Sequence, residues 1–295
     1  MSEVEAVRLR SMTPDDVALG MRLKTLAGWN QRAADWEMLL RAGVGLVAVV
    51  EAPEGTTVPV GTATVVPYAD VFSWIGMVLV DPAYRRRGIG TRLLEASIAL
   101  ARRHGVPRLD ATPQGEPLYQ RLGFNAEYGL VRLRRESGVR LPAASGAGGA
   151  NVRCETLTSA LIEKLVRYDA SVFGAPRPVI LTALRERAPR YAYAAWRDRD
   201  LVGYILGRPG SDYDQIGPLL ADDPEVAQAL LRSALARCGD RRVILDVPVD
   251  RGKWLAFLEG LGFARQRPFT RMALGTARTF GQPARQYAIA GPEIG

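Results

Sequence analysis

The chain has 295 residues, of which 47% are apolar and 24% charged, a balance typical of a folded protein too long for one hydrophobic core. Its longest apolar stretch, residues 44–50, is far shorter than the roughly 18 to 20 residues that cross a bilayer. The start, MSEVEAVRLR, has no apolar segment behind a basic region, so we expect no secretion signal. Only Cys154 and Cys238 occur, without metal-ligand spacing, so we expect no metal site and a cytoplasmic location.

An excess of basic residues, 39 against 31 acidic ones, gives a net charge of +8 and raises nucleic-acid binding as an alternative. Only Lys24, Lys164 and Lys253 are lysines, a skew better explained by a GC-rich coding genome than by phosphate recognition. The arginines are scattered apart from residues 85–87, and no basic run alternates with aromatic residues. We therefore expect neither a nucleic-acid nor a membrane partner.

In the first half, alternating apolar residues predict strands, and helical spacing fills the gaps between them. Two short helices, near residues 15–26 and 32–42, flank the loop 28–31, and a longer helix is predicted from about Gly88 to His104. The predicted strands lie near residues 6–12, 45–52, 58–68, 72–80, 108–111 and 126–133, and a last short helix covers 116–122.

The stretch SGVRLPAASGAGGA, from Ser137 to Ala150, has no hydrophobic period and little bulk to bury, which predicts a flexible linker. We therefore predict a first domain over residues 1–137, a linker over 138–150, a second domain over 151–275 and an added tail over 276–295.

The second half repeats the order of the first. Ile75-Gly76 with Asp81-Pro82 is echoed by Ile216-Gly217 with Asp223-Pro224, and Leu122-Gly123-Phe124 is echoed by Leu261-Gly262-Phe263. The two halves therefore look like copies of one fold. The second copy is predicted to have strands near 152–157, within 191–220, and near 243–247 and 269–274, with helices near 160–172, 179–188, 225–238 and 253–261.

The most informative segment, MVLVDPAYRRRGIGTRLLEASIALARRHG, is a strand that enters a glycine-containing turn and a long amphipathic helix. Gly88 and Gly90 leave the backbone open to a ligand, and the first helical turn has unpaired N–H groups and a positive dipole end. Three arginines, residues 85–87, add full charges. The turn therefore predicts a diphosphate site, the alternative being a helix cap beside a solvated basic turn.

The strand ending Val80-Asp81-Pro82, followed by Arg85-x-x-Gly88-x-Gly90 and Leu93-Leu94, resembles the cofactor signature of the GNAT N-acetyltransferase superfamily. Leu118-Tyr119-Gln120-Arg121-Leu122-Gly123-Phe124 is similar to that superfamily's closing element, and the resemblance covers most of residues 1–137. It implies an α/β (α+β) fold, here two tandem GNAT folds, each a mixed, mostly antiparallel sheet flanked by helices. It also implies acetyl-CoA as co-substrate.

The resemblance implies specific backbone contacts to acetyl-CoA. The strand before the turn would pair with the pantetheine arm, and an N–H of Val78 or Leu79 would stabilise the oxyanion formed in acyl transfer. The predicted cofactor-binding residues are Met77, Val78, Leu79, Val80, Arg85, Arg86, Arg87, Gly88, Ile89, Gly90 and Thr91.

Tyr119 matches the family's general-acid position, and a tyrosine with an ordinary pKa of about 10 is protonated at neutral pH. The alternative is a helix residue that packs under the sheet. Asp110 is the first candidate for the base, directly or through water, because it ends a predicted strand near Tyr119; a salt bridge is its alternative role. Glu51, Asp70 and Glu116 are further candidates, and for each of the four carboxylates the alternative is a salt bridge or a solvated surface position.

Thr112 stands where many family members have an asparagine, so a pantetheine contact usually made there is in doubt. By resemblance the first two helices border the acceptor pocket, which makes Trp29, Asn30 and Trp36 candidate substrate contacts; the alternative is a tryptophan pair that closes a small core. The expected acceptor is a small-molecule amine, with a protein amine or a non-catalytic acyl-CoA-binding module as alternatives, in a monomer or homodimer.

The second copy lacks the arginine–glycine turn. Asp222, Asp223, Pro224 and Glu225 stand in its place, and such carboxylates cap a helix but repel a diphosphate. Leu258 stands at the position of Tyr119. The sequence therefore predicts one active site per chain and a degenerate second domain.

Overall fold

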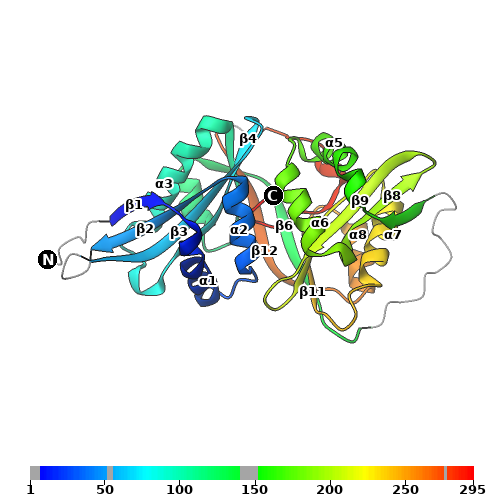
Figure 1. The fold of residues 1–295 in the computed structure, drawn as a ribbon, viewed down its shortest axis with the longest axis horizontal. Coiled ribbons are helices and arrows are strands. Elements are labelled where there is room, and N and C mark those ends of the chain that lie inside the picture. The colour runs from blue at the N-terminus through cyan, green and yellow to red at the C-terminus, as the bar shows by residue number, and fades with distance from the viewer. Residues whose placement is uncertain (1–6, 52–55, 140–151, 276–277) are drawn as a thin grey trace. The chain divides into compact units, whose positions relative to one another are not determined.

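The structure, a computed structural model, describes residues 7–51, 56–139, 152–275 and 278–295 (Figure 1). Most of the predicted linker, from residue 140 on, lies outside the described residues. Contacts between residues divide the chain into two compact units, residues 1–109 with Ile294 and residues 110–293 with Gly295. No helix in the described ranges has both the length and the apolar character needed to cross a bilayer.

The first unit is built on a mixed sheet in the order β1-β2-β3-β4-β5. Its pairs are antiparallel except for β4 with β5, which is parallel. The strands are β1 (Val7–Ser11), β2 (Val44–Glu51), β3 (Thr57–Tyr68), β4 (Phe72–Val80) and β5 (Val106–Ala111), and the helices are α1 (Val17–Leu26), α2 (Ala33–Ala42) and α3 (Ile89–Ala101), with 3-10 turns η1 (Pro14–Asp16), η3 (Pro82–Tyr84) and η4 (Arg102–His104).

Both faces of this sheet are buried. On one face, Leu46, Ala48 and Val50 of β2 share a core cluster with Ile89 and Leu93 of α3. Because side chains alternate along a strand, the equally buried residues between them, at 47 and 49, point to the opposite face, where α1 and α2 pack on the sheet (Figure 1). The helix pair and α3 thus enclose β2 to β4.

The second unit has a sheet in the order β12-β6-β11-β10-β9-β8-β7, with β13 paired to β10. Only the pair β10–β11 is parallel among the pairs described here. The strands are β6 (Phe124–Arg135), β7 (Arg153–Thr156), β8 (Tyr193–Arg197), β9 (Asp200–Arg208), β10 (Asp214–Ala221), β11 (Val243–Pro248), β12 (Ala264–Leu274) and β13 (Gln286–Ala288). The helices are α4 (Glu116–Arg121), α5 (Ile162–Phe173), α6 (Pro178–Arg187), α7 (Pro224–Leu235) and α8 (Gly252–Gly260), with 3-10 turns η5 (Ser159–Leu161), η6 (Pro189–Tyr191) and η7 (Pro283–Arg285).

Strand β6 belongs to the first sequence copy but lies between β11 and β12 of the second. A buried ion pair fixes this placement, because Arg132 of β6 donates to both oxygens of Asp246 in β11, at 2.7 and 2.8 Å. The predicted boundary at residues 138–150 is a boundary of the sequence repeat. The compact units divide at residue 109 instead, because a strand paired on both edges is part of the sheet that it completes.

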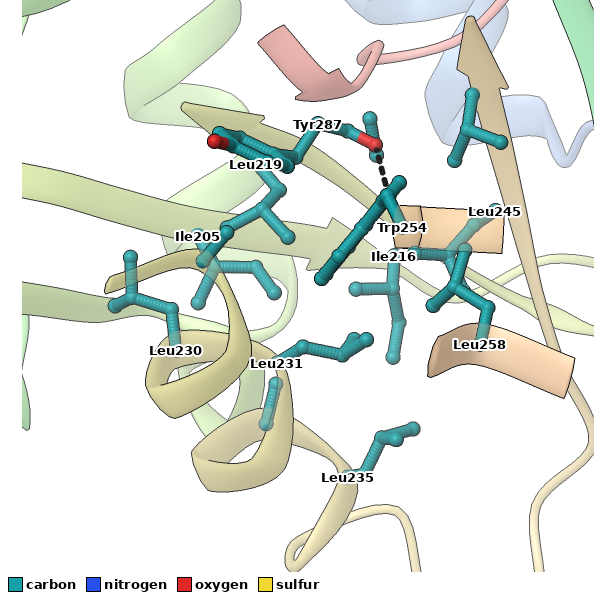
Figure 2. Packing of buried hydrophobic residues seen from close by; sticks show 14 of the residues in the cluster. Ile205, Ile216, Leu219, Leu230, Leu231, Leu235, Leu245, Trp254, Leu258 and Tyr287 are labelled. Atoms are coloured by element: carbon teal, nitrogen blue, oxygen red, sulfur yellow. Dashed lines mark hydrogen bonds between the residues drawn. The ribbon is translucent and has the colours of Figure 1, made fainter. Parts of the chain in front are cut away.

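The core of the second unit lies between its sheet and helices α7 and α8 (Figure 2). Leu230 and Leu231 of α7 share this core cluster with Leu258 and Trp254 of α8, and the Trp254 indole donates to the backbone oxygen of Tyr287 at 3.0 Å. Leu258, the counterpart of Tyr119, is completely buried.

The α/β fold, in which mixed, mostly antiparallel strand pairing in each unit is flanked by helices, confirms the predicted fold class. Predicted element bounds agree to within a few residues, and the broad strand region 191–220 resolves into β8, β9 and β10. The segment 276–295, predicted as an added tail, contributes a buried strand to the second unit.

Candidate active site

A bulge interrupts β4 at the segment predicted to bind the pantetheine arm. Thr62 pairs with Leu79 but Thr64 pairs with Gly76, so two residues of β4, Met77 and Val78, oppose a single residue of β3. Met77 has φ of +51°, an uncommon value for a residue with a side chain, and its carbonyl accepts a hydrogen bond from the Thr62 hydroxyl at 3.0 Å. The bulge therefore re-aims the backbone that follows.

The same strand separates from its other neighbour. Within the described residues, β4 pairs with β5 only at residues 72–74, which oppose residues 106–108. Beyond Trp74 the edge of β4, including the segment Met77–Val80, is therefore open to an extended ligand that adds as a strand. Val78 and Val80 are half-buried, whereas the side chains of Met77 and Leu79 are buried in the unit.

The turn after β4 ends at an exposed helix start. Gly88 caps α3 with φ of +78°, and a Cβ placed on it would have nothing within 4 Å. A Cβ on Gly90 would meet only the Val80 side chain, at 3.7 Å. The first turn of a helix leaves N–H groups, here those of residues 89–91, without acceptors inside the helix. Open space, free amides and the positive dipole end together form a cradle that fits an anion.

Three exposed arginines surround this cradle. The Arg87 guanidinium stacks over the Tyr84 ring at 5.0 Å, and Arg85 donates to the Val80 carbonyl at 3.3 Å. Arg86 has φ of +63°, which places a second left-handed residue in the turn. The turn thus presents concentrated positive charge beside the helix start, as the sequence predicted.

Asp81 anchors the turn, a role that its place in the motif alone did not reveal. Its carboxylate accepts from Arg22 at 2.5 Å and from the N–H of Ala83 at 3.0 Å, and its own N–H donates to the Val60 carbonyl. Burial disfavours its charge, but the hydrogen bonds and charge of Arg22 outweigh that cost and the pKa of Asp81 lies below its ordinary value.

Tyr119 lies in the second unit, on α4. Its ring packs edge-to-face on Phe124 with 6.1 Å between centroids, and burial raises its pKa to about 12. A Cβ on Gly115 would lie 2.9 Å from the tyrosine ring and 3.3 Å from its hydroxyl, so the missing side chain at residue 115 sets the ring position. A glycine four residues before the tyrosine, on the same helix face, was the sequence signal from which this contact could have been predicted.

Asp110 is held by a partner that sequence spacing did not reveal. Arg271 of β12 donates to both of its oxygens, at 2.8 and 2.9 Å, and also to the Tyr128 hydroxyl at 2.8 Å. Both charged side chains are buried, with 0% and 1% of their surface exposed. A carboxylate in such a pair is a poor proton acceptor, so we do not retain the base assignment of Asp110.

The other carboxylates that are candidates for the base also have hydrogen-bonding partners. Glu51 meets Arg8 at 2.9 Å and Asp70 meets His104 at 2.9 Å, both at exposed positions, and Glu116 accepts from the Thr270 hydroxyl at 2.9 Å. The salt-bridge alternative describes Glu51 and Asp70, whereas Glu116 is half-buried and held by hydrogen bonds. His104 ends its helix beside its acidic partner Asp70, in keeping with a structural role.

The candidate acceptor contacts fall into two environments. Trp29 and Asn30 are half-buried in the loop between α1 and α2. Trp36 has no exposed surface, and a Cβ on Gly20 would lie 2.6 Å from its ring, so the indole fills the space beside α1. This geometry matches the core alternative for Trp36 and leaves Trp29 and Asn30 as the candidates for direct contact.

The second copy starts its helix as predicted. Asp223 caps α7, since its carboxylate accepts from the Val226 N–H at 3.0 Å, and Arg197 neutralises it at 2.9 Å. Asp222 accepts from the Tyr168 hydroxyl at 2.8 Å. The described part of the chain has no group of three or more potential metal ligands.

Comparison with known proteins identifies the fold. Residues 22–124 match the family model described as Acetyltransferase (GNAT) family, and residues 165–288 match a second one, described as Acetyltransferase (GNAT) domain. The holothin acyltransferase of Pseudoalteromonas sp. (strain SANK 73390) is 26% identical over 80% of this chain and 78% of its own length.

Two solved structures extend the match to nearly the whole chain. One, assigned as an acetyltransferase from Pyrococcus horikoshii, superposes with a TM-score of 0.79 at 25% identity and covers 98% of this chain and 96% of its own. The other, a tandem GNAT protein from the clavulanic acid biosynthesis pathway, has a TM-score of 0.62 at 17% identity and covers 93% of this chain and 100% of its own.

Two copies of one acetyltransferase fold in a single chain define the class of tandem GNAT proteins. The chain belongs to the GNAT acetyltransferase family and is an N-acetyltransferase with two GNAT domains in tandem.

Proposed function

We propose that the chain transfers an acetyl group from acetyl-CoA to a primary amine, with the co-substrate bound by the first copy. The observation that carries the proposal is the open edge of β4 running into the bare, arginine-flanked start of α3. These residues fit acetyl-CoA, because an extended arm can pair with residues 77–80 while its diphosphate meets the amides of residues 86–91.

Acetyl-CoA would supply an activated acetyl group as a thioester. The N–H of Val78 or Leu79, re-aimed by the bulge, would donate to the acetyl oxygen as negative charge develops there, an effect often worth about 3 to 4 kcal/mol. Because the bulge fixes this N–H beforehand, the chain need not reorganise during the reaction.

The resemblance to the family assigns Tyr119 as the general acid that protonates the departing thiolate. Burial raises the pKa of Tyr119 to about 12, so its hydroxyl carries a proton throughout the neutral range. We assign water, in place of Asp110, as the acceptor of the proton that the amine loses. A primary alkylamine has a pKa near 10 and is mostly charged at pH 7. We therefore expect activity to rise with pH, because the fraction of neutral amine rises.

The acceptor is proposed to be a small molecule, with Trp29 and Asn30 at its binding site. The relative named holothin acyltransferase carries a compound name for its acceptor, which favours this class over a protein amine. Two cysteines, Cys154 and Cys238, are free, which supports action in the reducing cytoplasm.

The test combines calorimetry with acetyl-CoA and an assay of thiol release with a panel of small amines. Wild-type protein should bind acetyl-CoA and release CoA with at least one amine. Gly88→Glu should abolish binding by placing a negative charge in the cradle, whereas Gly239→Glu is the matched control, since both glycines have positive φ and open space around them. Intact binding in Gly88→Glu would refute the site. Binding without thiol release would leave an acyl-CoA-binding module.

A further inference from the structure

The two copies have an equivalent strand edge. In the first, Val80 pairs with Gly61 and Leu79 with Thr62, and the Asp81 N–H donates to the Val60 carbonyl at 2.8 Å. The corresponding contacts in the second copy join Ala221 to Gly203, Leu220 to Tyr204 and the Asp222 N–H to the Val202 carbonyl at 2.9 Å. Leu219 and Leu220 therefore occupy the positions of Val78 and Leu79.

The second copy also keeps the open geometry of this edge. Its β10 has a register shift between Ile216 and Leu219, one residue before the position that corresponds to the bulge of β4. Strand β10 pairs with β11 only at Asp214 and Gln215 in the described range, just as β4 pairs with β5 only at its start. Past Gln215 the two strands diverge.

A segment of the chain itself fills this divergence. Leu219 pairs with Ala288 and Leu220 with Gln286, so β13 adds antiparallel to the edge. On its other side the Ile289 N–H donates to the backbone oxygen of Asp246 in β11, at 2.9 Å. Residues 286–290 thus lie where the first copy would receive the pantetheine arm.

The fit of this segment is close and buried. Residues 286–290 have at most 5% of their surface exposed. Tyr287 packs edge-to-face on Trp254 at 5.1 Å, and its carbonyl accepts from the same indole (Figure 2). Gly217 permits the approach, because a Cβ there would lie 2.0 Å from the Ile289 carbonyl oxygen.

Charges around the segment are reversed relative to the first copy. There the turn after the strand carries arginines and suits an anionic ligand; here it carries Asp222, which pairs with Arg285 at the start of the same segment. Farther along, Glu293 pairs with the buried Arg208, and Arg177 donates to the Gly295 backbone oxygen at 2.7 Å. The segment therefore matches its groove in charge as well as in backbone pairing.

We infer that residues 285–290 are a built-in occupant of the second copy's cofactor groove, bound in place of the pantetheine arm, so that the second domain has no acyl-CoA site. This inference rests on the proposed function, because it takes the β4 edge as the place where the arm of acetyl-CoA binds. It assigns to the C-terminal segment the role of completing the degenerate domain by strand addition.

Hydrogen–deuterium exchange of the full chain, with and without saturating acetyl-CoA, measures the protection of backbone amides in each of the two grooves separately. Amides of residues 219–221 and 286–290 should exchange as slowly as the core strands without any ligand, and acetyl-CoA should leave them unchanged. Within residues 77–91, the amides that face the open edge of β4 or the start of α3 should gain protection when acetyl-CoA is added. No effect at residues 77–91 would contradict the proposed function alone.

Two results would overturn the inference itself: fast exchange of residues 286–290 in the unliganded protein, or an acetyl-CoA-dependent change at residues 219–221. Gly217→Ala adds an independent test, because its Cβ would clash with Ile289. It should speed exchange of residues 286–290 by about tenfold or more while the response at residues 77–91 persists. Gly239→Ala, which also has positive φ but whose Cβ would have nothing within 4 Å, is the matched control. Unaltered exchange in Gly217→Ala would count against the fitted groove.

Discussion

The guanidinium of Arg271 in β12 donates hydrogen bonds to both carboxylate oxygens of Asp110 in the interior of the second unit. Burial disfavours the charge of Arg271, but the adjacent carboxylate outweighs it and raises the pKa of the guanidinium. An ion pair of this kind joins a residue of the first sequence copy to a strand of the second. It therefore explains Asp110 as a structural residue, in place of the catalytic one that its position beside α4 suggested.

Asp110→Asn should destabilise the protein far more than it changes the reaction. Removing the negative charge leaves Arg271 buried without compensation, which typically costs about 3 to 5 kcal/mol. Denaturant unfolding should show this loss, whereas Asp70→Asn, which breaks an exposed pair with His104, should cost at most about 1 kcal/mol. Folded Asp110→Asn should keep the pH profile of wild-type turnover. A stable variant that loses the rise of turnover on the acid side of that profile would restore Asp110 as the base.

Arg86→Glu should weaken acetyl-CoA binding through the diphosphate. The reversal places a negative charge beside the start of α3, and we expect roughly a tenfold or greater loss that shrinks as salt is added. Calorimetry at several salt concentrations measures both effects. Arg103→Glu, an exposed reversal at the far end of the same helical segment, is the control. S-acetylpantetheine, which lacks the diphosphate, should bind equally to Arg86→Glu and wild type; an equal loss for both ligands would indicate local unfolding instead.

Tyr119→Phe should lower turnover by about 10- to 1000-fold while sparing acetyl-CoA affinity, because it removes a proton donor but keeps the ring. Gly115→Ala should lower turnover too, since its Cβ would displace that ring. Steady-state kinetics and calorimetry separate the two quantities. Unchanged turnover in Tyr119→Phe would remove the hydroxyl from the mechanism.

The raised pKa of Tyr119 also predicts an alkaline effect on stability. A folded pKa of about 12 above an unfolded value of about 10 means that the unfolded chain loses its proton first. The stabilising difference is complete below pH 10 and disappears as pH rises toward 12. Unfolding free energies should therefore fall less steeply for Tyr119→Phe than for wild type across this window. Parallel slopes would mean that the hydroxyl is not desolvated.

Local patterns in the sequence predicted most of the elements and the cradle, because helix starts, glycine turns and apolar periodicity depend on residues that are close in the sequence. The bulge at Met77 was not visible, since it depends on pairing with β3. The placement of β6 between two strands of the second copy was also hidden, because both copies offer similar strands and only long-range pairs such as Arg132–Asp246 select the partner. The same limit applies to β13, whose composition did not distinguish a strand from a tail.

The two tryptophans of the α1–α2 region should separate binding from stability. Trp36 has no exposed surface, so Trp36→Ala should lower the free energy of unfolding by about 3 to 5 kcal/mol, and the milder Trp36→Phe should leave KM for the amine unchanged. Trp29 is half-buried in the connecting loop, so Trp29→Ala should cost less stability and raise KM for the amine several-fold while acetyl-CoA affinity stays the same. Thermal unfolding measures the loss of stability, and steady-state kinetics with the best amine of the panel measure KM. If Trp29→Ala left KM unaltered, the acceptor would have to bind away from this loop.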